Sequence, residues 1–568
     1  MLKSKKQSKK SKKHSKKQDK QATPTINLKE KLAQKRKAAK AKKELTSLLS
    51  TAISGGVFLG MILFFAVGIK LALPGFAGVI VLTLSYKYPR QALFAFIVYV
   101  PFGGTIIYLL GNSPILQLAK DAFYIPAAIA LYQKCKKQKM PFLLPQGIKV
   151  PFFILLGLCL ITLLFVNGLQ QINPPPPPNL FDPPPKEMPF GMGILGLKVF
   201  LGYFPLITCA YYLIRNKRDF LLISRLQIIM ILICCVLGFV QYMLLVVGIC
   251  EGTRNAVGDD LFKATLNARC FIGGSLVFSP SQGMIRLPGT FVAPWQWAWF
   301  LISSTFFTFA TGFNDPSIIW RIISLVSLLT VFLNAVISGQ RIALALVPAC
   351  FILLLILTGQ IKRLKAFLPL FLLIVLVGFG AIASNPAVVQ ERLDSFISRW
   401  NASPPYEFIT QQFEESWHFL EKDGEYLGKG LGRATNSARV LGKTQLIETY
   451  YPKIIYEIGP LGAIGFLIFA TSLTIICFRT YRSVKNRNFR GYGAALWVFI
   501  LFISYNTYYY PLDVDPVAVY YWFFAGVLLK LPEIDKMERL KEEQNQEVEN
   551  KQKKGKGRVK ESQVNLNI

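Results

Sequence analysis

The stretch PFFILLGLCLITLLFVNGL, from Pro151 to Leu169, decides the class of fold. It contains no charged residue and approaches the roughly 20 apolar residues with which a helix crosses a hydrocarbon core. Inside lipid, a helix satisfies every backbone N–H and C=O within its own segment. Similar apolar blocks lie at Leu48–Ile69 and Ala366–Ala383. The sequence therefore predicts an all-α protein that crosses a bilayer many times.

The composition agrees with this class of protein. Of the 568 residues, 52% are hydrophobic and only 17% are charged, against about a quarter in a typical soluble domain. The net charge of +34 is uneven, because residues 1–43 hold 18 Lys or Arg and two acidic residues. This Lys/Ser-rich tail, residues 1–46, predicts disorder and lacks the apolar region of a signal peptide. We expect it to stay in the cytoplasm and contact membrane lipids. Without interleaved aromatic residues, nucleic acid is not an expected partner.

Charge in the connecting segments predicts an orientation. With the basic tail inside, the connections on the same side are basic, as in Lys134–Lys139 and Arg479–Arg490, whereas most of those outside hold few cations. We expect about 12 to 14 spans in a membrane domain from 47 to 530, and a charged, mobile tail from 531 to 568, with both termini in the cytoplasm of a bacterium. The spans are predicted near 47–69, 71–87, 91–110, 115–132, 150–169, 191–213, 219–249, 292–311, 317–337, 341–358, 366–383, 453–478, 491–510 and 515–530, the first two of which could instead form a hairpin.

Three long segments are expected outside. Residues 167–188 contain two proline runs, which favour an extended spacer. The second segment is 251–290. The third and largest, 384–452, has amphipathic stretches around Val388–Trp400 and Phe413–Leu420 that predict helices.

The nine cysteines contain no CxxC pattern and lie mostly in apolar segments. Cys250 and Cys270 are exceptions, because they bracket the first part of the second external segment. They can form a disulfide if this segment faces an oxidising compartment, and the sequence leaves that question open.

Two arginines at the predicted outer boundary are candidates for binding a phosphate. Arg286 precedes the turn residue Gly289 and the span that starts at 292, and Arg341 ends the tight turn that begins at Ser338. A guanidinium can make two parallel hydrogen bonds to a phosphate. The alternative for both is an arginine that extends its charged group to the interface.

The largest external segment supplies further candidates. Arg433 ends the glycine-rich sequence Gly428-Lys-Gly-Leu-Gly-Arg433, which lacks the pattern of a nucleotide-binding loop. Glu457 lies inside an apolar helix, either as a functional group or in a structural ion pair. His418 lies beside Trp417 and is the only histidine outside the N-terminal tail, where packing is the alternative to a role as a base.

No metal site is predicted. The sequence has no HExxH motif or cluster of metal ligands, and no Ser-His-Asp arrangement. Asp513-Val-Asp515 has the spacing of a metal-binding aspartate pair, but it lies in a short connection between two spans, and we discount it. No cofactor is expected.

Taken together, these motifs resemble the O-antigen ligase and O-antigen polymerase superfamily over roughly residues 190–480. The resemblance rests on R-x-x-GTF-x-x-P from Arg286, S-G-x-R ending at Arg341, one large external loop, and E-x-G-x-x-G from Glu457. It implies a fold like that of the GT-C glycosyltransferases and transfer of a glycan from an undecaprenyl-pyrophosphate donor to an acceptor on the external face. It also implies that Arg286 and Arg341, with Arg433, stabilise the pyrophosphate.

This chain departs from the ligase pattern at one position. Ligases carry a histidine nine residues before the glutamate of E-x-G, and this chain has Glu448 there. A carboxylate can accept the proton of an acceptor hydroxyl. We therefore expect Glu448, Arg286 and Arg341 to act in catalysis, and Arg433, Glu457 and His418 to bind substrate.

The sequence thus predicts a membrane glycosyltransferase, polymerase or ligase, for polysaccharide of the cell envelope. Its expected partners are a lipid-linked oligosaccharide, a glycan or lipid acceptor, membrane lipids and envelope-assembly proteins. Two alternatives remain: a transporter or flippase for a lipid-linked or anionic substrate, and a scaffold protein. A transporter should place charges at membrane depth and show repeat symmetry.

Overall fold

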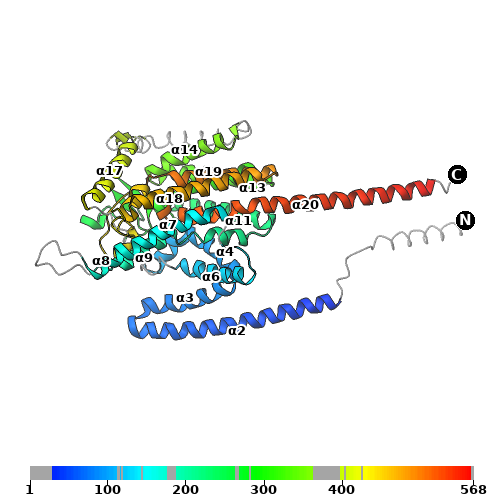
Figure 1. Ribbon diagram of the computed structural model, residues 1–568, viewed down its shortest axis with the longest axis horizontal. Helices are drawn as coiled ribbons and strands as arrows, with labels where there is room; N and C mark the ends of the chain where they lie inside the picture. Colours follow the sequence, from blue (N-terminus) through cyan, green and yellow to red (C-terminus); the bar gives the residue numbers. More distant parts are fainter. Residues whose placement is uncertain are drawn as a thin grey trace, which may run out of the picture. The chain divides into compact units, whose positions relative to one another are not determined.

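The computed structural model describes residues 28–564, except 112–115, 117–118, 143–144, 175–186, 262–267, 281–282, 362–389, 391–393, 395–396, 399, 402–403 and 424–425. The regular structure in these residues is almost entirely helical (Figure 1). Eight of the described helices are long and apolar enough to cross a membrane. The chain is therefore an all-α, multi-pass membrane protein. These helices span Lys35–Ala66, Pro89–Leu109, Gln146–Ile172, Pro189–Leu213, Lys217–Val246, Ile318–Ile337, Tyr450–Ser483 and Val517–Glu547.

The chain divides into two compact units, residues 1–84 and 85–568. The first contains α2 (Leu28–Val67) and most of α3 (Ile69–Lys87). These helices form a hairpin, because Gly68 turns the chain with φ of 95°. Gly56 lets the two helices approach closely, since a Cβ there would lie 2.9 Å from the Phe76 carbonyl oxygen.

The second unit is a helical bundle with one short hairpin. Its elements are α4 (Pro89–Tyr99), η1 (Val100–Phe102), α5 (Gly103–Leu109), α6 (Asp121–Lys137), η3 (Gln146–Ile148), α7 (Lys149–Thr162), η4 (Leu163–Asn167), α8 (Gly168–Ile172), α9 (Pro189–Leu201), α10 (Leu206–Leu213), α11 (Lys217–Val246), η5 (Gly258–Leu261), β1 (Val277–Ser279), β2 (Met284–Arg286), α12 (Pro294–Asn314), α13 (Ile318–Ile337), α14 (Arg341–Leu357), α17 (Pro405–Asp423), η8 (Asn436–Val440), α18 (Tyr450–Ser483), α19 (Arg487–Tyr505), η9 (Pro511–Asp513) and α20 (Val517–Val564).

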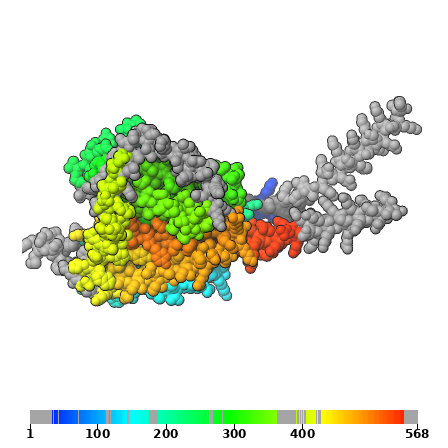
Figure 2. Space-filling view, turned by 90° about the horizontal axis from the view of Figure 1, so that it is seen from above, coloured from blue at the N-terminus to red at the C-terminus, as the bar shows by residue number. Residues whose placement is uncertain are grey.

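The core of this unit surrounds α12 and the first half of α20, both of which are buried along most of that length. Phe307 of α12 contacts Tyr520 and Phe524 of α20, with ring centroids 5.4 and 4.3 Å apart. Helix α17 lies across one end of the bundle, which we call the α17 end (Figures 1 and 2). The residues of interest lie where α12 and α18 begin and α19 ends.

The opposite end is closed by buried carboxylates. Asp315, which follows α12, accepts hydrogen bonds of 3.0 and 2.9 Å from the guanidinium of Arg225 on α11. Asp535 on α20 accepts hydrogen bonds from the backbone N–H groups of Lys485 and Asn486, which connect α18 to α19. These pairs fix the helix ends and leave the candidate chemistry at the α17 end.

Both charged tails are more helical than expected from the sequence. Helix α2 begins at Leu28, inside the tail predicted to be disordered, and α20 continues to Val564. Ala, Lys, Gln and Glu dominate these segments and are strong helix formers. Each tail also continues an apolar helix, so no new helix nucleus has to form.

Two other differences concern the external segments. The hairpin of β1 and β2 was not predicted; its strands are antiparallel and pair Val277 with Arg286. The amphipathic stretch 413–420 lies in α17, as predicted. The predicted span 366–383, most of the proline-rich segment and most of the stretch 388–400 lie outside the described residues.

The structure joins Cys250 to Cys270 in a disulfide, and the other seven cysteines are buried free thiols. The pairing that the sequence left open is therefore present. Denatured protein should take up seven maleimide groups without reductant and nine after reduction, as counted by intact mass spectrometry. Nine without reductant would contradict the disulfide.

Candidate functional site

Arg286 is held at the end of β2 by a well-ordered turn. The Gln241 side chain of α11 both donates to the Gly289 carbonyl oxygen, at 3.3 Å, and accepts from the Gly289 N–H, at 3.0 Å. Gly289 has φ of 55° and lies against the Trp297 ring, where a Cβ would approach to 2.4 Å. A glycine is required by both the conformation and the space. The turn thus fixes the path of the chain from Arg286 into α12.

The turn that precedes Arg341 lies beside this segment. The Leu287 N–H donates to the Ser338 carbonyl oxygen at 2.9 Å. Gly339 follows in a left-handed conformation with φ of 69°, and α14 begins at Arg341. Two arginines 55 positions apart in sequence are thereby anchored by adjoining backbone segments, as expected if both serve one site.

Glu448 reaches the same region through the segment that joins α19 to η9. The Tyr509 N–H donates to the Glu448 carbonyl oxygen at 2.9 Å, and Thr449 forms a β-bridge with Tyr508. The Trp299 indole N–H of α12 donates to the Tyr509 carbonyl oxygen at 3.1 Å. Helix α12 therefore connects the Arg286 turn to the Glu448 segment.

The charges of these groups are complementary. Burial lowers the pKa of Arg286, and the neighbouring Tyr509 and Glu448 partly offset that effect. The Arg286 Nε is buried without a hydrogen-bond partner among the described residues. A buried polar atom without a partner is costly, so this nitrogen is a candidate for binding a ligand. We call Arg286, Glu448 and Tyr509 the Arg286 cluster.

Arg433 is engaged elsewhere. Its guanidinium donates to the Gln170 Oε1 at 3.2 and 2.9 Å and forms an ion pair with Glu187 at 2.7 Å. Burial alone would raise the pKa of Glu187, but the hydrogen bonds from Arg433 and the Lys443 N–H lower it below its usual value. Arg433 thus fastens its loop to neighbouring segments, and its described contacts do not include the Arg286 cluster.

The glycine-rich loop 428–432 also makes contacts within the protein. Its N–H groups donate to the carbonyl oxygens of Tyr456 and Glu457 and to the side chain of Asn167. Glu457 Oε1 accepts from the Ala434 N–H at 2.8 Å and from the Thr435 hydroxyl at 2.9 Å. These donors are used within the fold, so they are not a free cradle for phosphate. The structural interpretation of Glu457 agrees with these contacts.

Gly459 lies in the contact between the segment 426–428 and α18, where there is no room for a side chain. Its φ is 80°, and a Cβ would lie 1.9 Å from the Tyr426 carbonyl oxygen. We expect Gly459→Ala to destabilise the protein by at least about 2 kcal/mol, through backbone strain and overpacking. The control is Gly157→Ala in α7, where a Cβ meets nothing within 4 Å. Equal melting temperatures of both variants in detergent would contradict the prediction.

A buried cation that was not predicted lies one helical turn before Glu457. Lys453 forms an ion pair with Asp513, and its Nζ lies 4.0 Å from Glu457 Oε2. The Lys453 and Glu457 side chains are each 4% exposed. A Lys and a Glu four residues apart in an apolar helix were a signal for this pair.

Asp515 is paired in the same way. It forms an ion pair with Lys120. Asp121, the residue after Lys120, forms an ion pair of 2.7 Å with Lys198 on α9. Both carboxylates of the Asp513-Val-Asp515 sequence are therefore neutralised by lysines. This supports discounting the sequence as a metal-binding pair, and among the described residues no group of three His, Cys, Asp or Glu could hold a metal.

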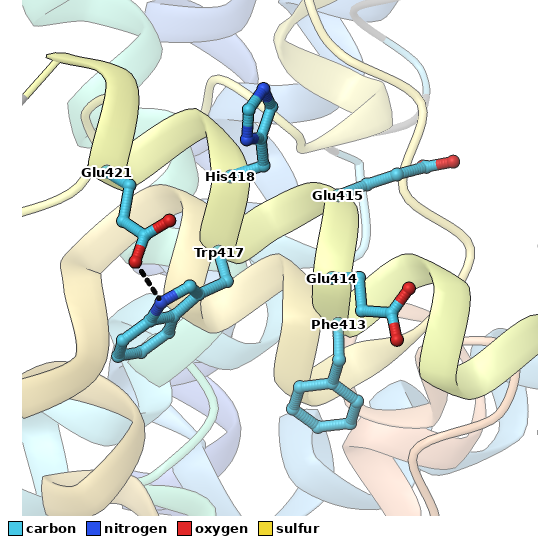
Figure 3. A pocket seen from close by; sticks show the side chains of 6 residues that line it. All are labelled: Phe413, Glu414, Glu415, Trp417, His418 and Glu421. Carbon is cyan, nitrogen blue, oxygen red and sulfur yellow. Dashed lines mark hydrogen bonds between the residues drawn. The ribbon is translucent and has the colours of Figure 1, made fainter.

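His418 lies on α17 and is exposed. It lines a surface pocket with Phe413, Glu414, Glu415, Trp417 and Glu421, all from the same helix. Figure 3 shows that His418 points away from the Trp417 ring, whose N–H donates to Glu421 at 3.3 Å. The pocket contains no member of the Arg286 cluster. His418 is therefore not brought to Glu448 by the contacts described.

Helix α17 does cover the Glu448 segment through its other face. The Gln412 Oε1 accepts a hydrogen bond of 3.2 Å from the Glu448 N–H, and the Phe408 ring packs edge-on against Tyr508 with centroids 6.0 Å apart. Residues 408 and 412 are one helical turn apart and so lie on the same face.

Comparison with protein families gives no matching family model, and comparison with curated proteins gives no match.

Proposed function

We propose that this protein is a membrane glycosyltransferase of the O-antigen ligase or polymerase type. It transfers or polymerises a glycan from an undecaprenyl-pyrophosphate donor on the external face of a bacterial inner membrane. The observation that supports this proposal best is the Arg286 cluster, in which a partly buried arginine, whose buried Nε has no partner among the described residues, lies near a carboxylate. The segment of Arg286 also adjoins the turn of Arg341.

The proposed reaction gives each of these residues a chemical role. A hydroxyl oxygen of the acceptor attacks the anomeric carbon of the donor glycan. The bond from that carbon to the pyrophosphate oxygen breaks, and its electrons leave with the pyrophosphate. The hydroxyl proton passes to the Glu448 carboxylate. Arg286 and Arg341 balance the charge that develops on the leaving group.

The proposed orientation has the N-terminus and C-terminus in the cytoplasm, about 12 to 14 spans and a large external loop at 384–452. Two observations support it. The disulfide between Cys250 and Cys270 lies at the end of α11 that adjoins the Arg286 turn, and disulfides form in oxidising compartments. The basic segment 479–490, which comprises the last turn of α18, the connection and the first turn of α19, lies at the opposite end.

A deletion strain tests the proposal. Loss of a surface or exported polysaccharide, or a changed distribution of its chain lengths, is the expected result, with recovery on expression of the intact gene. An unchanged glycan profile, by gel and by mass spectrometry of released glycans, would contradict the proposal.

A transporter or flippase is the second candidate, because two lysines in apolar helices form ion pairs, the buried Lys453 with Asp513 and the partly buried Lys198 with Asp121. Charged residues at this depth are typical of transport pathways. Reconstituted vesicles distinguish the two functions. A transporter moves a lipid-linked oligosaccharide across the bilayer without changing it. A transferase forms a new glycosidic bond even in detergent, where there are no two membrane faces between which a substrate could be transported.

A further inference from the structure

Residues 508–510 form an unusual turn of three tyrosines. Tyr509 and Tyr510 have φ values of 56° and 32°, a left-handed conformation that is uncommon for residues other than glycine. Bulky residues persist in this region only where the surrounding structure holds them, and such positions gather at functional sites. The contacts around residues 508–510 show what stabilises this conformation and which groups lie near the Tyr509 side chain.

The turn is held from both sides. Its backbone binds the Trp299 indole and the Glu448 carbonyl oxygen through Tyr509. A few residues later, Asp513 pairs with Lys453 and Asp515 pairs with Lys120. Helix α19 has already ended at Tyr505, and the Tyr510 carbonyl oxygen accepts a hydrogen bond of 3.1 Å from the Asp513 N–H of η9. These fixed points prevent the turn from relaxing.

The held conformation keeps Tyr509 next to Glu448, through its hydrogen bond of 2.9 Å to the Glu448 carbonyl oxygen. The charges of Arg286 and Glu448 both act on the phenol electrostatically. Burial, followed by the Glu448 charge, raises the pKa of Tyr509, so the phenol is neutral and can donate a proton in a hydrogen bond at physiological pH. A neutral phenol and a guanidinium side by side form a pair of donors suited to an anionic oxygen.

We propose that Tyr509 contacts the substrate by donating a hydrogen bond from its hydroxyl to a phosphate oxygen of the leaving pyrophosphate, beside Arg286. This inference rests on the proposed function and adds a residue that the motifs did not identify. It also gives the left-handed turn a role, because the turn places the Tyr509 hydroxyl, a hydrogen-bond donor, near the Arg286 cation. Two donors from different segments would then hold the pyrophosphate in one orientation.

Binding of inorganic pyrophosphate to the purified protein in detergent, measured by calorimetry, tests this contact. Tyr509→Phe keeps the ring and removes only the hydroxyl. A hydrogen bond to a charged group is worth enough that its loss should weaken binding by about tenfold or more. The control is Tyr505→Phe, because the Tyr505 hydroxyl bonds Thr471 on an exposed surface. This control should bind pyrophosphate as the wild type does.

The results separate this inference from the function on which it rests. Unchanged binding by Tyr509→Phe, with binding lost in Arg286→Ala, overturns the role of Tyr509 alone. Equal binding by the wild type and Arg286→Ala, or none by the wild type, overturns the pyrophosphate site itself. If Tyr509→Phe does not fold, Tyr509→His, which keeps a ring N–H donor, is compared with Tyr509→Leu. Equal affinity of these two variants would then overturn the contact.

Discussion

Replacement of Arg286 by alanine is expected to lower the proposed glycan transfer by at least about a hundredfold, the usual cost of losing a donor that stabilises developing charge. The guanidinium is largely buried, and its Nε has no partner among the described residues. Its loss therefore removes the cation whose charge acts on Glu448 and Tyr509. We expect expression and melting temperature to change little.

Two further variants make this prediction specific. Arg286→Lys keeps the charge but loses the planar pair of donors, so its activity should lie between those of the wild type and Arg286→Ala. Arg254→Ala is the matched control, because Arg254 is an exposed arginine that packs over Phe278 of the same hairpin. Glycan products are measured with membranes and a lipid-linked donor. Full activity in Arg286→Ala would remove Arg286 from the site.

Replacement of either partner of the Lys453–Asp513 pair is expected to destabilise the protein strongly. Both side chains are buried, with exposures of 4% and 8%. Among the described ion pairs, Asp513→Leu leaves the Lys453 charge with Glu457, 4.0 Å away, and Lys453→Met removes the cation paired with the Asp513 carboxylate. Breaking a buried pair in this way costs about 3 to 5 kcal/mol.

A double replacement distinguishes a pair from two independent residues. Lys453→Met combined with Asp513→Leu removes both charges and should recover much of the stability lost in each single variant. Thermal unfolding in detergent measures the coupling. The control is Lys541→Ala, since Lys541 is 59% exposed and pairs with Glu538 at the surface, where about 0 to 1 kcal/mol is expected. Additive losses in the double variant would contradict the pairing.

The helices were the most predictable part of the structure. Apolar length is a local property of the sequence, and α13, at Ile318–Ile337, almost coincides with the predicted span 317–337. Among the described residues, eight helices are long and apolar enough to cross a membrane, against the 12 to 14 expected for the whole chain. The described parts of the tails, 28–46 and 531–564, are helical, which charge and low complexity did not predict. Lys and Ala favour helix where an adjoining span already supplies the first turns. The β1–β2 hairpin is short and held by tertiary contacts, which sequence patterns do not reveal.

Parts of the candidate site have a signal in the sequence. Arg286 and Arg341 stand in recognisable motifs, and the structure brings their backbone segments together. The roles of Arg433 and Lys453 depend on partners distant in sequence, such as Glu187 and Asp513. No local pattern specifies such pairings. Tyr509 was missed for a similar reason, because its left-handed conformation is imposed by the segments around it.

The glycine-rich loop has a consequence for how the site works. Gly432 packs against the Met192 backbone and Gly428 against the Glu457 backbone, so at these two positions the loop has no side chain that could rearrange. The segment that runs from this loop toward Glu448 therefore starts at a tightly packed backbone contact. A ligand arriving at such a site does not have to organise it first, so less of its binding energy is lost to ordering the protein.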